Sequence, residues 1–553
     1  MKTRNVSLPM TASISVLLLV SALSAQGQAQ WPIAGQNLNN SRSQPAEHLI
    51  NRANVHSLRV KWVFKTSNDV SATPTVHNDA VYFPDSGGNL YAVNKETGSL
   101  IWSHQIADYD GVKGALSRVS PAVDIANHQL IIGDNVIGFG GGIRTNPAML
   151  TPSNLKTVGA NVIAVDQGTG LLKWITKVSK HPASIITGSP VIFDGVVYIG
   201  VSSFEETLAA TKFKTYPCCT FRGSVVALNA KTGKVLWQTF TVPDNGGVQG
   251  GYSGAVVWQP PAIDKKRGSL YVGTGDNYTA PLDVEACQNK LPNDDCTALD
   301  DYFDSVLALD LKTGQIKWAR KAREFDTWTV ACLTEKTPNK DCEVPASPDF
   351  DFGGSGPNLV GNIVGFGQKS GIYWALDPDT GDLVWATQVG PGSDLGGIEW
   401  GTATDDKSIY VAISDADKIE YTLVPSGRKI TWGSWGAVDV ATGKILWQTA
   451  DPTKGTFDIG SVSVANGVLY APSLSGQMYA LNTASGKILW NFASGGSVID
   501  GPSIVDGAVY WGSGYTIGTG NNKVYAFTLA SEKNRGAQSD RGDNHADNHG
   551  KQD

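Results

Sequence analysis

A phrase that ends in tryptophan recurs along the chain and constrains the fold more than any other feature. Each copy has a short apolar strand, an Asp or Asn, a Thr-Gly or Ser-Gly turn, and a second strand that carries the tryptophan. Seven complete copies end at Trp102, Trp174, Trp237, Trp318, Trp385, Trp447 and Trp490. An eighth copy is divided, with its first strand at 524–527 and its tryptophan at Trp62. Repetition at this scale predicts an array of small sheets.

Each copy has the pattern of a β-hairpin. Glycine supplies the positive φ of the turn, and Asn or Asp bonds its own backbone there. Another strand pair precedes most copies, as in 189–200. Four strands per unit, repeated radially, are typical of a β-propeller blade. The eight tryptophans therefore predict an all-β, eight-bladed propeller, in which they wedge neighbouring blades together. The divided copy predicts that an N-terminal strand completes the last blade and leaves no free sheet edge.

The two ends of the chain differ in composition from the repeats. Lys2 and Arg4 precede an apolar run at 14–23 and then small residues, which is the pattern of a secretory signal peptide. The expected divisions are a signal peptide at 1–29, the propeller at 30–529 and a polar, disordered tail at 530–553. No stretch is long enough for a membrane span. We expect a periplasmic or secreted protein, with His545 and His549 solvated in the tail.

Charge and cysteine content narrow the function classes. The net charge of −7 argues against nucleic acid or an anionic membrane as a partner. Six cysteines fit an oxidising compartment. We expect the pairs Cys287/Cys296 and Cys332/Cys342 to close short polar loops as disulfides, because no histidines cluster with them as zinc ligands would. Cys218 and Cys219 are adjacent and could form only an eight-membered ring. The absence of Cys-x-x-Cys-His excludes covalent haem c.

Several residues fall where inner strands should meet the central axis. The spacing between tryptophans is longest from Trp102 to Trp447, so the long loops of that region are expected to carry the function. Arg118 and Thr187 each precede an inner strand, which indicates one axial ligand rich in carboxylates or carbonyls. Trp258 and Trp400 lie outside the repeat, where each could stack on a ligand or simply fill the core.

Several charged residues in the same region each have more than one possible role. Asp276 and Asn277 follow a strand and could ligate Ca²⁺ or form an ordinary Asx turn. Glu205 and Glu206 could be solvated or supply further ligands to the same ion. Lys369 could be a turn lysine, and Asp326 could be a general base or a surface turn residue. No Gly-x-Ser-x-Gly, P-loop or His-Glu-x-x-His motif occurs, which disfavours serine hydrolases, nucleotide-binding proteins and zincins.

Taken together, these residues resemble one family. The repeat is similar to that of the PQQ-binding quinoprotein alcohol dehydrogenases, eight-bladed propellers that hold pyrroloquinoline quinone (PQQ) and usually Ca²⁺ on the axis. Within that family, the chain is most similar to the branch containing polyvinyl-alcohol dehydrogenases. Three segments carry this finer resemblance: 216–224 (YPCCTFRGS), 266–275 (KRGSLYVGTG) and 396–401 (GGIEWG).

The resemblance implies roles for individual residues. Arg118 and Thr187 match positions that bind the quinone's carboxylates and nearby oxygens, and Trp258 matches the tryptophan that stacks on one quinone face. Lys369 matches the Lys or Arg that bonds the ortho-quinone oxygens. Two further positions match metal ligands.

Those ligand positions are Glu206, with Glu205 as the alternative in register, and Asp276, which stands where the family has Asn. The adjacent cysteines Cys218 and Cys219 are a family hallmark and would cover the other quinone face, although here they follow Glu206 in the chain. The family's catalytic aspartate directly follows a tryptophan. Here Trp328 is followed by Thr329, and the nearest acid is Asp326.

The expected activity is oxidation of an alcohol, with secondary alcohols and polymers among the expected substrates, to a carbonyl. Ca²⁺ would polarise the quinone, Lys369 would assist, and Asp326 would take the hydroxyl proton. Without a cytochrome segment, electrons would pass to a separate acceptor such as a cytochrome c. Two alternatives remain at this point. One is a non-enzymatic scaffold resembling the outer-membrane assembly propellers, and the other is a PQQ-dependent sugar dehydrogenase.

Overall fold

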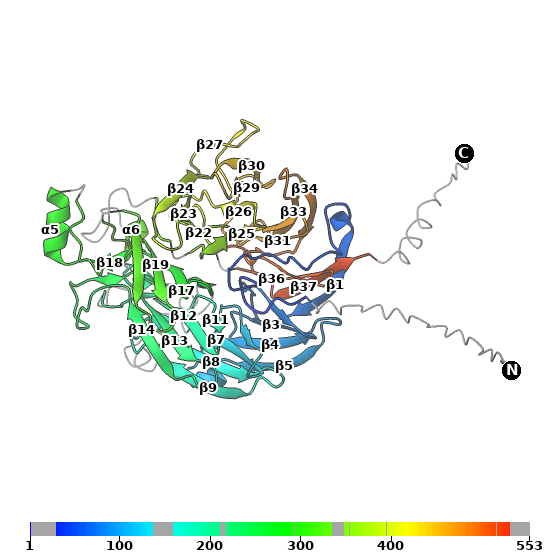
Figure 1. Cartoon of the computed structure of the whole chain (residues 1–553), viewed down its shortest axis with the longest axis horizontal. Helices are drawn as coiled ribbons and strands as arrows, with labels where there is room; N and C mark the ends of the chain where they lie inside the picture. The colour runs from blue at the N-terminus through cyan, green and yellow to red at the C-terminus, as the bar shows by residue number, and fades with distance from the viewer. Residues whose placement is uncertain are drawn as a thin grey trace, which may run out of the picture.

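The computed structural model describes Met1 and residues 29–530 apart from 136–158, 211–215, 217, 292–293, 324, 335–347, 353, 394 and 516. Within those residues the chain forms eight antiparallel blade sheets, seven with four strands and one with a fifth short strand, β10, that follow one another around a ring in chain order (Figure 1). The eight-bladed propeller expected from the repeat is confirmed. The expected signal peptide and tail fall almost wholly outside the described residues.

The first four blades share one plan, in which successive strands pair from the axis outward. Their strands are β2 (Thr75–His77), β3 (Ala80–Pro84), β4 (Asn89–Asn94) and β5 (Leu100–Gln105); β6 (Ala122–Asp124), β7 (Gln129–Gly133), β8 (Asn161–Asp166) and β9 (Leu172–Lys177); β11 (Val191–Phe193), β12 (Val196–Ser203), β13 (Ser224–Asn229) and β14 (Val235–Phe240); and β16 (Ala262–Asp264), β17 (Ser269–Gly273), β19 (Ser305–Asp310) and β20 (Ile316–Lys321).

Blades five to seven repeat that plan. Their strands are β21 (Asn358–Val360), β22 (Ile363–Gly367), β23 (Ile372–Leu376) and β24 (Leu383–Gln388); β25 (Ala403–Thr404), β26 (Ser408–Ile413), β29 (Ser434–Asp439) and β30 (Ile445–Ala450); and β31 (Ser463–Ala465), β32 (Val468–Pro472), β33 (Gln477–Asn482) and β34 (Ile488–Ala493). The middle strands are buried along their length, whereas outer strands such as β24 alternate between exposed and partly buried residues.

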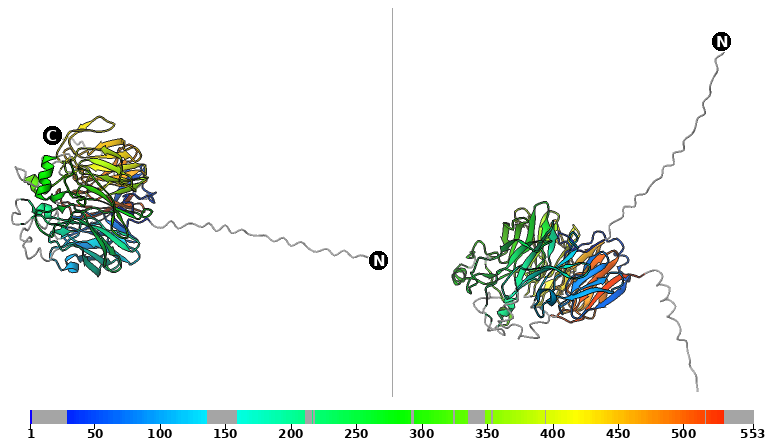
Figure 2. Two further views of the ribbon diagram at one scale, coloured as in Figure 1. Left: turned by 60° about the vertical axis from the view of Figure 1, so that its left-hand side comes forward. Right: turned by 90° about the horizontal axis from the view of Figure 1, so that it is seen from below.

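The last blade closes the ring with strands from both ends of the chain. It contains β35 (Ser503–Val505), β36 (Ala508–Ser513), β37 (Lys523–Leu529) and, outermost, β1 (Leu58–Lys65). β1 pairs antiparallel with β37 from Leu58↔Leu529 to Lys65↔Lys523, and the blue and red strands lie side by side in Figure 2. The predicted closure by an N-terminal strand is confirmed.

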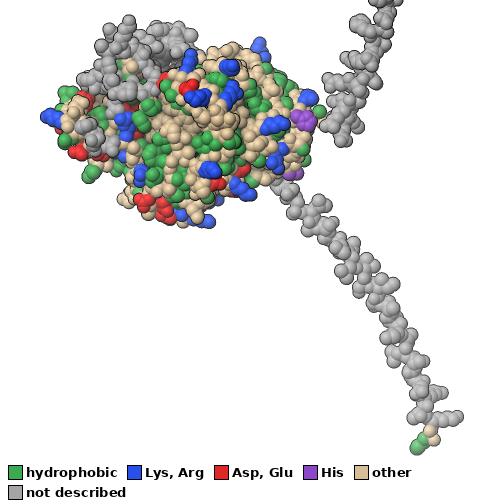
Figure 3. All heavy atoms as spheres, turned by 90° about the horizontal axis from the view of Figure 1, so that it is seen from above, with side chains coloured by type: hydrophobic (Ala, Val, Ile, Leu, Met, Phe, Trp, Pro, Cys, Tyr) green, Lys and Arg blue, Asp and Glu red, His purple; other side chains and the backbone are tan. Residues whose placement is uncertain are grey.

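Short elements decorate the ring. They are the strand pairs β15 (Ser253–Gly254) with β18 (Asn277–Thr279) and β27 (Tyr421–Thr422) with β28 (Lys429–Ile430), the strand β10 (Ser184–Ile185), the 3-10 turn η1 (Val55–Ser57), and the helices α1 (Ala107–Asp110), α4 (Glu205–Leu208), α5 (Leu282–Lys290) and α6 (Ala331–Thr334). None of the described helices has the length and apolar character needed to cross a membrane. Basic and acidic side chains are interspersed on the face shown in Figure 3.

The recurrent tryptophans join each blade to the next. The Trp447 indole N–H donates to the Thr483 carbonyl of the following blade at 2.8 Å, and the ring packs on Gly486. Gly486 has φ +68°, and a Cβ there would overlap the Trp447 ring, so glycine meets both needs of the turn. Six more tryptophans donate in the same way to the next blade: Trp62, Trp102, Trp174, Trp237, Trp318 and Trp385.

Trp490 is the exception, and the ring closure explains it. In the described chain its indole makes no such bond, because the next blade has no turn between its third and fourth strands: β37 and β1 come from opposite ends. Trp490 instead packs edge-on against Trp511 and Phe527, at centroid distances of 6.2 and 5.3 Å. Aromatic packing replaces the hydrogen bond at the point where the repeat is divided.

Candidate active site

Loops that precede the inner strands place aromatic and charged side chains at the axis. Arg118, Thr187 and Trp400, which precede β6, β11 and β25, line one polar cavity, together with Arg42 and Asp500. The Arg118 guanidinium lies 4.6 Å from the centre of the Trp400 ring. The shared placement of Arg118 and Thr187, inferred from their positions before inner strands, is therefore found in the structure.

Trp258 connects this cavity to a buried charged cluster. Its ring meets Trp400 edge-on at 5.2 Å, and the Thr187 hydroxyl lies 3.5 Å from its carbonyl oxygen. On the other side, Lys369 Nζ lies 5.2 Å from the ring centre, and the indole N–H donates to Asp351 Oδ2 at 3.0 Å. A continuous set of contacts thus runs from the cavity to Lys369.

Lys369 is a buried ion-pair partner rather than a turn lysine. Its Nζ donates to Asp349 Oδ2 at 2.8 Å and lies 3.2 Å from Asp351 Oδ2. Burial disfavours the ammonium, but the charges of Asp349 and Asp351 outweigh it and raise the pKa of Lys369 well above its usual value. Lys369 therefore stays protonated and offers a fixed positive charge beside Trp258 and Trp328.

Asp349 and Asp351 are functional candidates that the reading of the sequence missed. They lie in the segment Asp349-Phe-Asp351-Phe352-Gly, which leads to the inner strand β21. The reasoning that selected Arg118 and Thr187, a polar residue ahead of an inner strand, could have found them. The family pattern, an acid directly after a tryptophan, points instead to Trp328, because neither Asp349 nor Asp351 follows a tryptophan.

Asp326 is the acid nearest to Trp328 in the sequence, and its role as the base stays a prediction. Its Oδ2 pairs with Arg323 Nη1 at 3.1 Å, and its carboxylate groups with those of Asp276 and Asp304. The carboxylates that pair with Lys369 belong to Asp349 and Asp351. These two aspartates are therefore further candidates for a base beside Lys369.

Asp276 stands at the centre of the acidic residues. One oxygen from each of Asp276, Asp349 and Asp351 lies within 4.8 Å of the others, and all three residues are buried. Burial, followed by the charges of neighbouring aspartates, raises the pKa of Asp276 well above its usual value. Its Oδ1 has no hydrogen-bond partner. Such a group of hard oxygen atoms suits a divalent cation.

Glu206 faces the same charges. Burial raises its pKa to about 7, Lys369 opposes that rise, and Asp351 and Asp349 add to it. Its backbone carbonyl accepts the Val330 N–H at 3.1 Å, which ties α4 to the segment that carries Thr329. Glu206 is therefore one of the buried carboxylates that act electrostatically with Lys369, Asp349 and Asp351.

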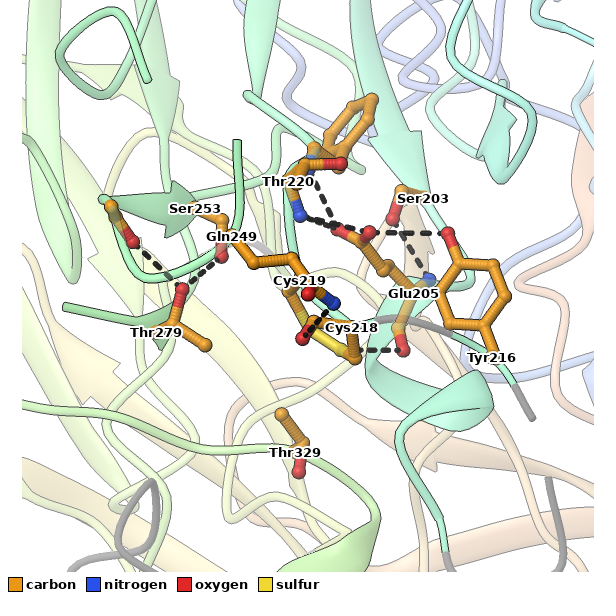
Figure 4. Close-up of a disulfide and its surroundings, with 12 residues drawn as sticks. Ser203, Glu205, Tyr216, Cys218, Cys219, Thr220, Gln249, Ser253, Thr279 and Thr329 are labelled. Atoms are coloured by element: carbon orange, nitrogen blue, oxygen red, sulfur yellow. Dashed lines mark hydrogen bonds between the residues drawn. A yellow bond between two sulfur atoms is a disulfide. The ribbon is translucent and has the colours of Figure 1, made fainter. Parts of the chain in front are cut away.

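Glu205, the alternative to Glu206 as an ion ligand, accepts hydrogen bonds from the protein itself. Its carboxylate accepts the backbone N–H groups of Thr220 at 2.9 Å and Phe221 at 2.7 Å, and the Tyr216 hydroxyl at 3.1 Å (Figure 4). These bonds position the segment that follows the cysteine pair, so the structure favours Glu206 over Glu205 as an ion ligand. Asn277 donates to Asp301 through Nδ2 at 2.8 Å, while its Oδ1 has no partner.

Cys218 and Cys219 form a disulfide between neighbours, which Figure 4 shows with its surroundings. The Gln249 amide donates to the Cys218 carbonyl at 3.1 Å. Cys218, Cys219 and Trp258 belong to one packed apolar cluster. Thr329 appears near the disulfide in Figure 4; it is buried, and its hydroxyl has no partner.

The other expected disulfides involve surface loops. Cys287 and Cys296 are bonded at 2.02 Å, as expected, and tie the end of α5 to the following loop. Cys332 is also disulfide-bonded, but its expected partner, Cys342, lies outside the described residues.

Comparison with known proteins identifies the family. The chain is 31% identical to a polyvinylalcohol dehydrogenase from Sphingopyxis sp., in a match covering 88% of this chain and 72% of the relative. A polyvinylalcohol dehydrogenase from Pseudomonas sp. is also 31% identical, covering 88% and 73%. The chain belongs to the PQQ-dependent quinoprotein alcohol dehydrogenases. It is therefore an oxidoreductase of this family rather than a scaffold.

Two family models also match. One, described as the β-propeller domain of glucose/ethanol/alcohol dehydrogenases, matches 173–332. The other, described as the outer membrane protein assembly factor BamB, matches 21–141, 52–216 and 433–534. The solved structure of a quinohemoprotein alcohol dehydrogenase from Comamonas testosteroni has a TM-score of 0.66 at 19% identity, covering 91% of this chain and 81% of its own, which supports the fold.

The residues at the axis fit the cofactor of this family. PQQ is a flat ring system with three carboxyl groups and an ortho-quinone. Trp258 offers an aromatic face, the Cys218–Cys219 disulfide offers a compact apolar surface, and Arg118 and Lys369 supply positive charge. The indole N–H groups of Trp328 and Trp400 are enclosed without a partner, as donors awaiting a ligand would be. The donor set thus matches an anionic, planar quinone.

Proposed function

We propose that this chain is an exported quinoprotein that oxidises secondary alcohol groups, including those of polyvinyl-alcohol-like polymers, to carbonyls. PQQ and Ca²⁺ would be its cofactors, and a separate acceptor such as a cytochrome c would take the electrons. The names of the two relatives at 31% identity support the substrate class. The signal-peptide pattern before Gln30 supports export to the periplasm or beyond.

In this proposal each axial side chain has one binding task. Arg118 and Thr187 would bind the carboxylates of the quinone, and Trp258 and the Cys218–Cys219 disulfide would cover its two faces. Lys369 would bond the quinone oxygens. Arginine suits the first task because its planar fork matches a carboxylate. Trp400, beneath the guanidinium of Arg118, would fix the orientation of that fork.

Glu206 and Asp276 would hold the Ca²⁺. Both carboxylates lie among buried acids with raised pKa values, and a cation would favour their ionised forms. When bound, the quinone would supply the two-electron oxidation of the alcohol carbon. The protein residues supply binding, orientation and the group that takes the proton.

Asp351 would take the hydroxyl proton of the substrate. The observation that carries this assignment is that Asp351 Oδ2 contacts both Trp258 Nε1, at 3.0 Å, and Lys369 Nζ, at 3.2 Å. The carboxylate is thereby fixed between the residue expected to stack on the quinone and the residue expected to bond its oxygens. In this position Asp351 would receive the hydroxyl proton as the carbonyl forms.

Reconstitution tests the proposal. The purified mature protein is titrated with PQQ in the presence of Ca²⁺, quinone absorbance is followed, and dye-linked oxidation is measured with propan-2-ol, polyvinyl alcohol, ethanol and glucose. We expect stoichiometric PQQ binding, with turnover highest on the secondary alcohol and the polymer. Turnover highest on glucose would favour the sugar dehydrogenase, and absence of PQQ binding would contradict the proposal.

Two further experiments test export and electron transfer. Expression with residues 1–29 intact should place the protein in the periplasmic or secreted fraction, and retention in the cytoplasm would contradict export. Addition of an oxidised c-type cytochrome in place of the dye should give substrate-dependent reduction. Turnover with the dye and none with any c-type cytochrome would assign the acceptor to another class.

A further inference from the structure

The acidic residues around Asp276 carry more negative charge than the described chain balances. Seven carboxyl groups act on one another there: Glu206, Asp276, Asp304, Asp326, Asp349, Asp351 and Glu399. The positive side chains paired with them in the described residues are Lys369 and Arg323. Buried charges need partners, and an excess of buried carboxylates is balanced by protons or by cations.

The carboxylates form two groups of three that share Asp276. One group adds Asp349 and Asp351 and lies against Lys369, so it belongs to the cofactor site already described. The other adds Asp304 and Asp326. In the second group all three residues are buried, and one oxygen of each lies within 4.8 Å of the others. Oxygens at that spacing can share one Ca²⁺ after small side-chain adjustments, since Ca²⁺ ligands lie at about 2.3–2.6 Å.

Asp304 provides an independent observation that points to a ligand in the second group. It is fully buried, and neither of its carboxylate oxygens has a hydrogen-bond partner. Its backbone is fixed, since its N–H donates to the Gly275 carbonyl at 3.1 Å and its own carbonyl accepts the Ala322 N–H at 3.0 Å. Asp304 is thus held in place with an enclosed carboxylate that groups with those of Asp276 and Asp326.

The neighbouring backbone holds the other two ligands in register. Residue Thr327 forms a parallel bridge with Asn277, so the residues before them, Asp326 and Asp276, come from adjacent chain segments. Asp326 Oδ2 pairs with Arg323 Nη1 at 3.1 Å, so one positive side chain lies beside the group of three carboxylates. The Trp328 N–H donates to the Asn277 carbonyl at 2.9 Å and continues the same pairing.

We propose that Asp276, Asp304 and Asp326 form a second cation site, which takes a hard divalent cation such as Ca²⁺. This site shares Asp276 with the one expected at Glu206 and Asp276 but takes its other two ligands from Asp304 and Asp326, and it does not require the quinone. Its ion joins the residues just before β18 and β19 to the segment 325–330. It therefore supports Trp328 and Thr329, which lie beside Lys369 and the disulfide.

Cation counting without PQQ tests the proposal. The full mature chain is stripped of metal, equilibrated with Ca²⁺ and dialysed, and bound Ca²⁺ is measured by elemental analysis. We expect Asp304→Asn and Asp326→Asn each to bind one ion fewer than the wild type, through a loss of affinity of about 100-fold or more at that site. Glu206→Gln should keep the ion that Asp304→Asn loses. Asp458→Asn, another buried aspartate without hydrogen bonds at its oxygens, should bind as many ions as the wild type.

The proposal is overturned if the wild type and Asp304→Asn bind the same number of Ca²⁺ ions. It is also overturned if neither protein binds Ca²⁺. Loss of the same ion in Glu206→Gln would also overturn it, because there would then be a single site. Circular dichroism selects folded variants, and Asp326→Asn replaces Asp304→Asn if the latter does not fold. PQQ titration is a separate measurement, so failure of the quinone proposal leaves this count unchanged.

Discussion

Buried polar groups differ between two regions of the propeller. These are the rim, where the recurrent tryptophans join neighbouring blades, and the axis, where the candidate cofactor residues lie. At the rim, seven tryptophans each donate their indole N–H to a carbonyl of the next blade, so the polar group is satisfied. At the axis, Asp276, Asp304 and the indoles of Trp328 and Trp400 have buried atoms without partners. Satisfied groups stabilise the chain alone, whereas unsatisfied ones that gather in one place are candidates for contact with a ligand. Stability should therefore depend on the rim and cofactor binding on the axis.

Removal of a rim tryptophan should give the largest loss of stability. Trp447→Ala removes a buried ring and its bond to Thr483, so the free energy of unfolding should fall by about 3–5 kcal/mol. Trp490→Ala, at the closure where no such bond exists, should cost about 1 kcal/mol less. Denaturant titration measures both, and PQQ affinity of the folded protein should stay within about twofold. A large loss of PQQ affinity in Trp447→Ala would break the separation between rim and axis.

A turn glycine at the rim should give a smaller effect. Gly486→Ala combines a strained φ of +68° with overlap of the Trp447 ring, and we expect a loss of about 2–3 kcal/mol. Gly195→Ala is the matched control, because Gly195 has φ +72° but nothing near its Cβ position. The difference between the two melting curves isolates the contact with tryptophan. Equal losses would show that backbone strain, rather than the packing between blades, requires the glycine.

Asp134, a buried aspartate that does not line the cofactor cavity, should make the free energy of unfolding depend on pH. Burial raises the pKa of Asp134 to about 8, although Asn161 donates to its carboxylate, and Asp110 adds to the rise. The folded protein therefore holds a proton that the unfolded chain loses near pH 4, and stability falls as pH rises between these values.

Asp134→Asn should remove that part of the pH dependence. Denaturation at about pH 5 and about pH 7 should show a loss of about 1–2 kcal/mol in the wild type that is reduced in the variant. Parallel pH profiles for the two proteins would show that Asp134 is ionised throughout. PQQ titration at both pH values separates this effect from any change at the axis.

The rim was predictable from the sequence in a way that the axis was not. Trp447 and Gly486 belong to a phrase repeated at a fixed spacing, and regular spacing alone implies equivalent contacts. Lys369 and Trp258 were found by resemblance, and the structure brings them within 5.2 Å of each other. Asp351 was missed because its segment follows a long loop and departs from the expected tryptophan–acid order.

Asp326 illustrates how little the sequence alone says about side-chain contacts at the axis. It lies two residues before Trp328, and in the structure its carboxylate pairs with Arg323 and groups with those of Asp276 and Asp304. The direction of a side chain in an irregular loop depends on its local partners, and no repeat encodes those. The axis is built from loops of different lengths, so each of its residues had to be placed by contacts made across blades.

The most direct test of the account is the turnover of Asp351→Asn at full PQQ occupancy. Absorbance establishes equal quinone content in the variant and the wild type, and dye-linked oxidation of propan-2-ol gives kcat/KM for both. The account predicts that the variant binds PQQ but loses turnover by about 10²–10⁴-fold, because the proton acceptor is gone while Trp258 and Lys369 remain. Turnover within about twofold of the wild type would contradict the assignment of Asp351 as the base.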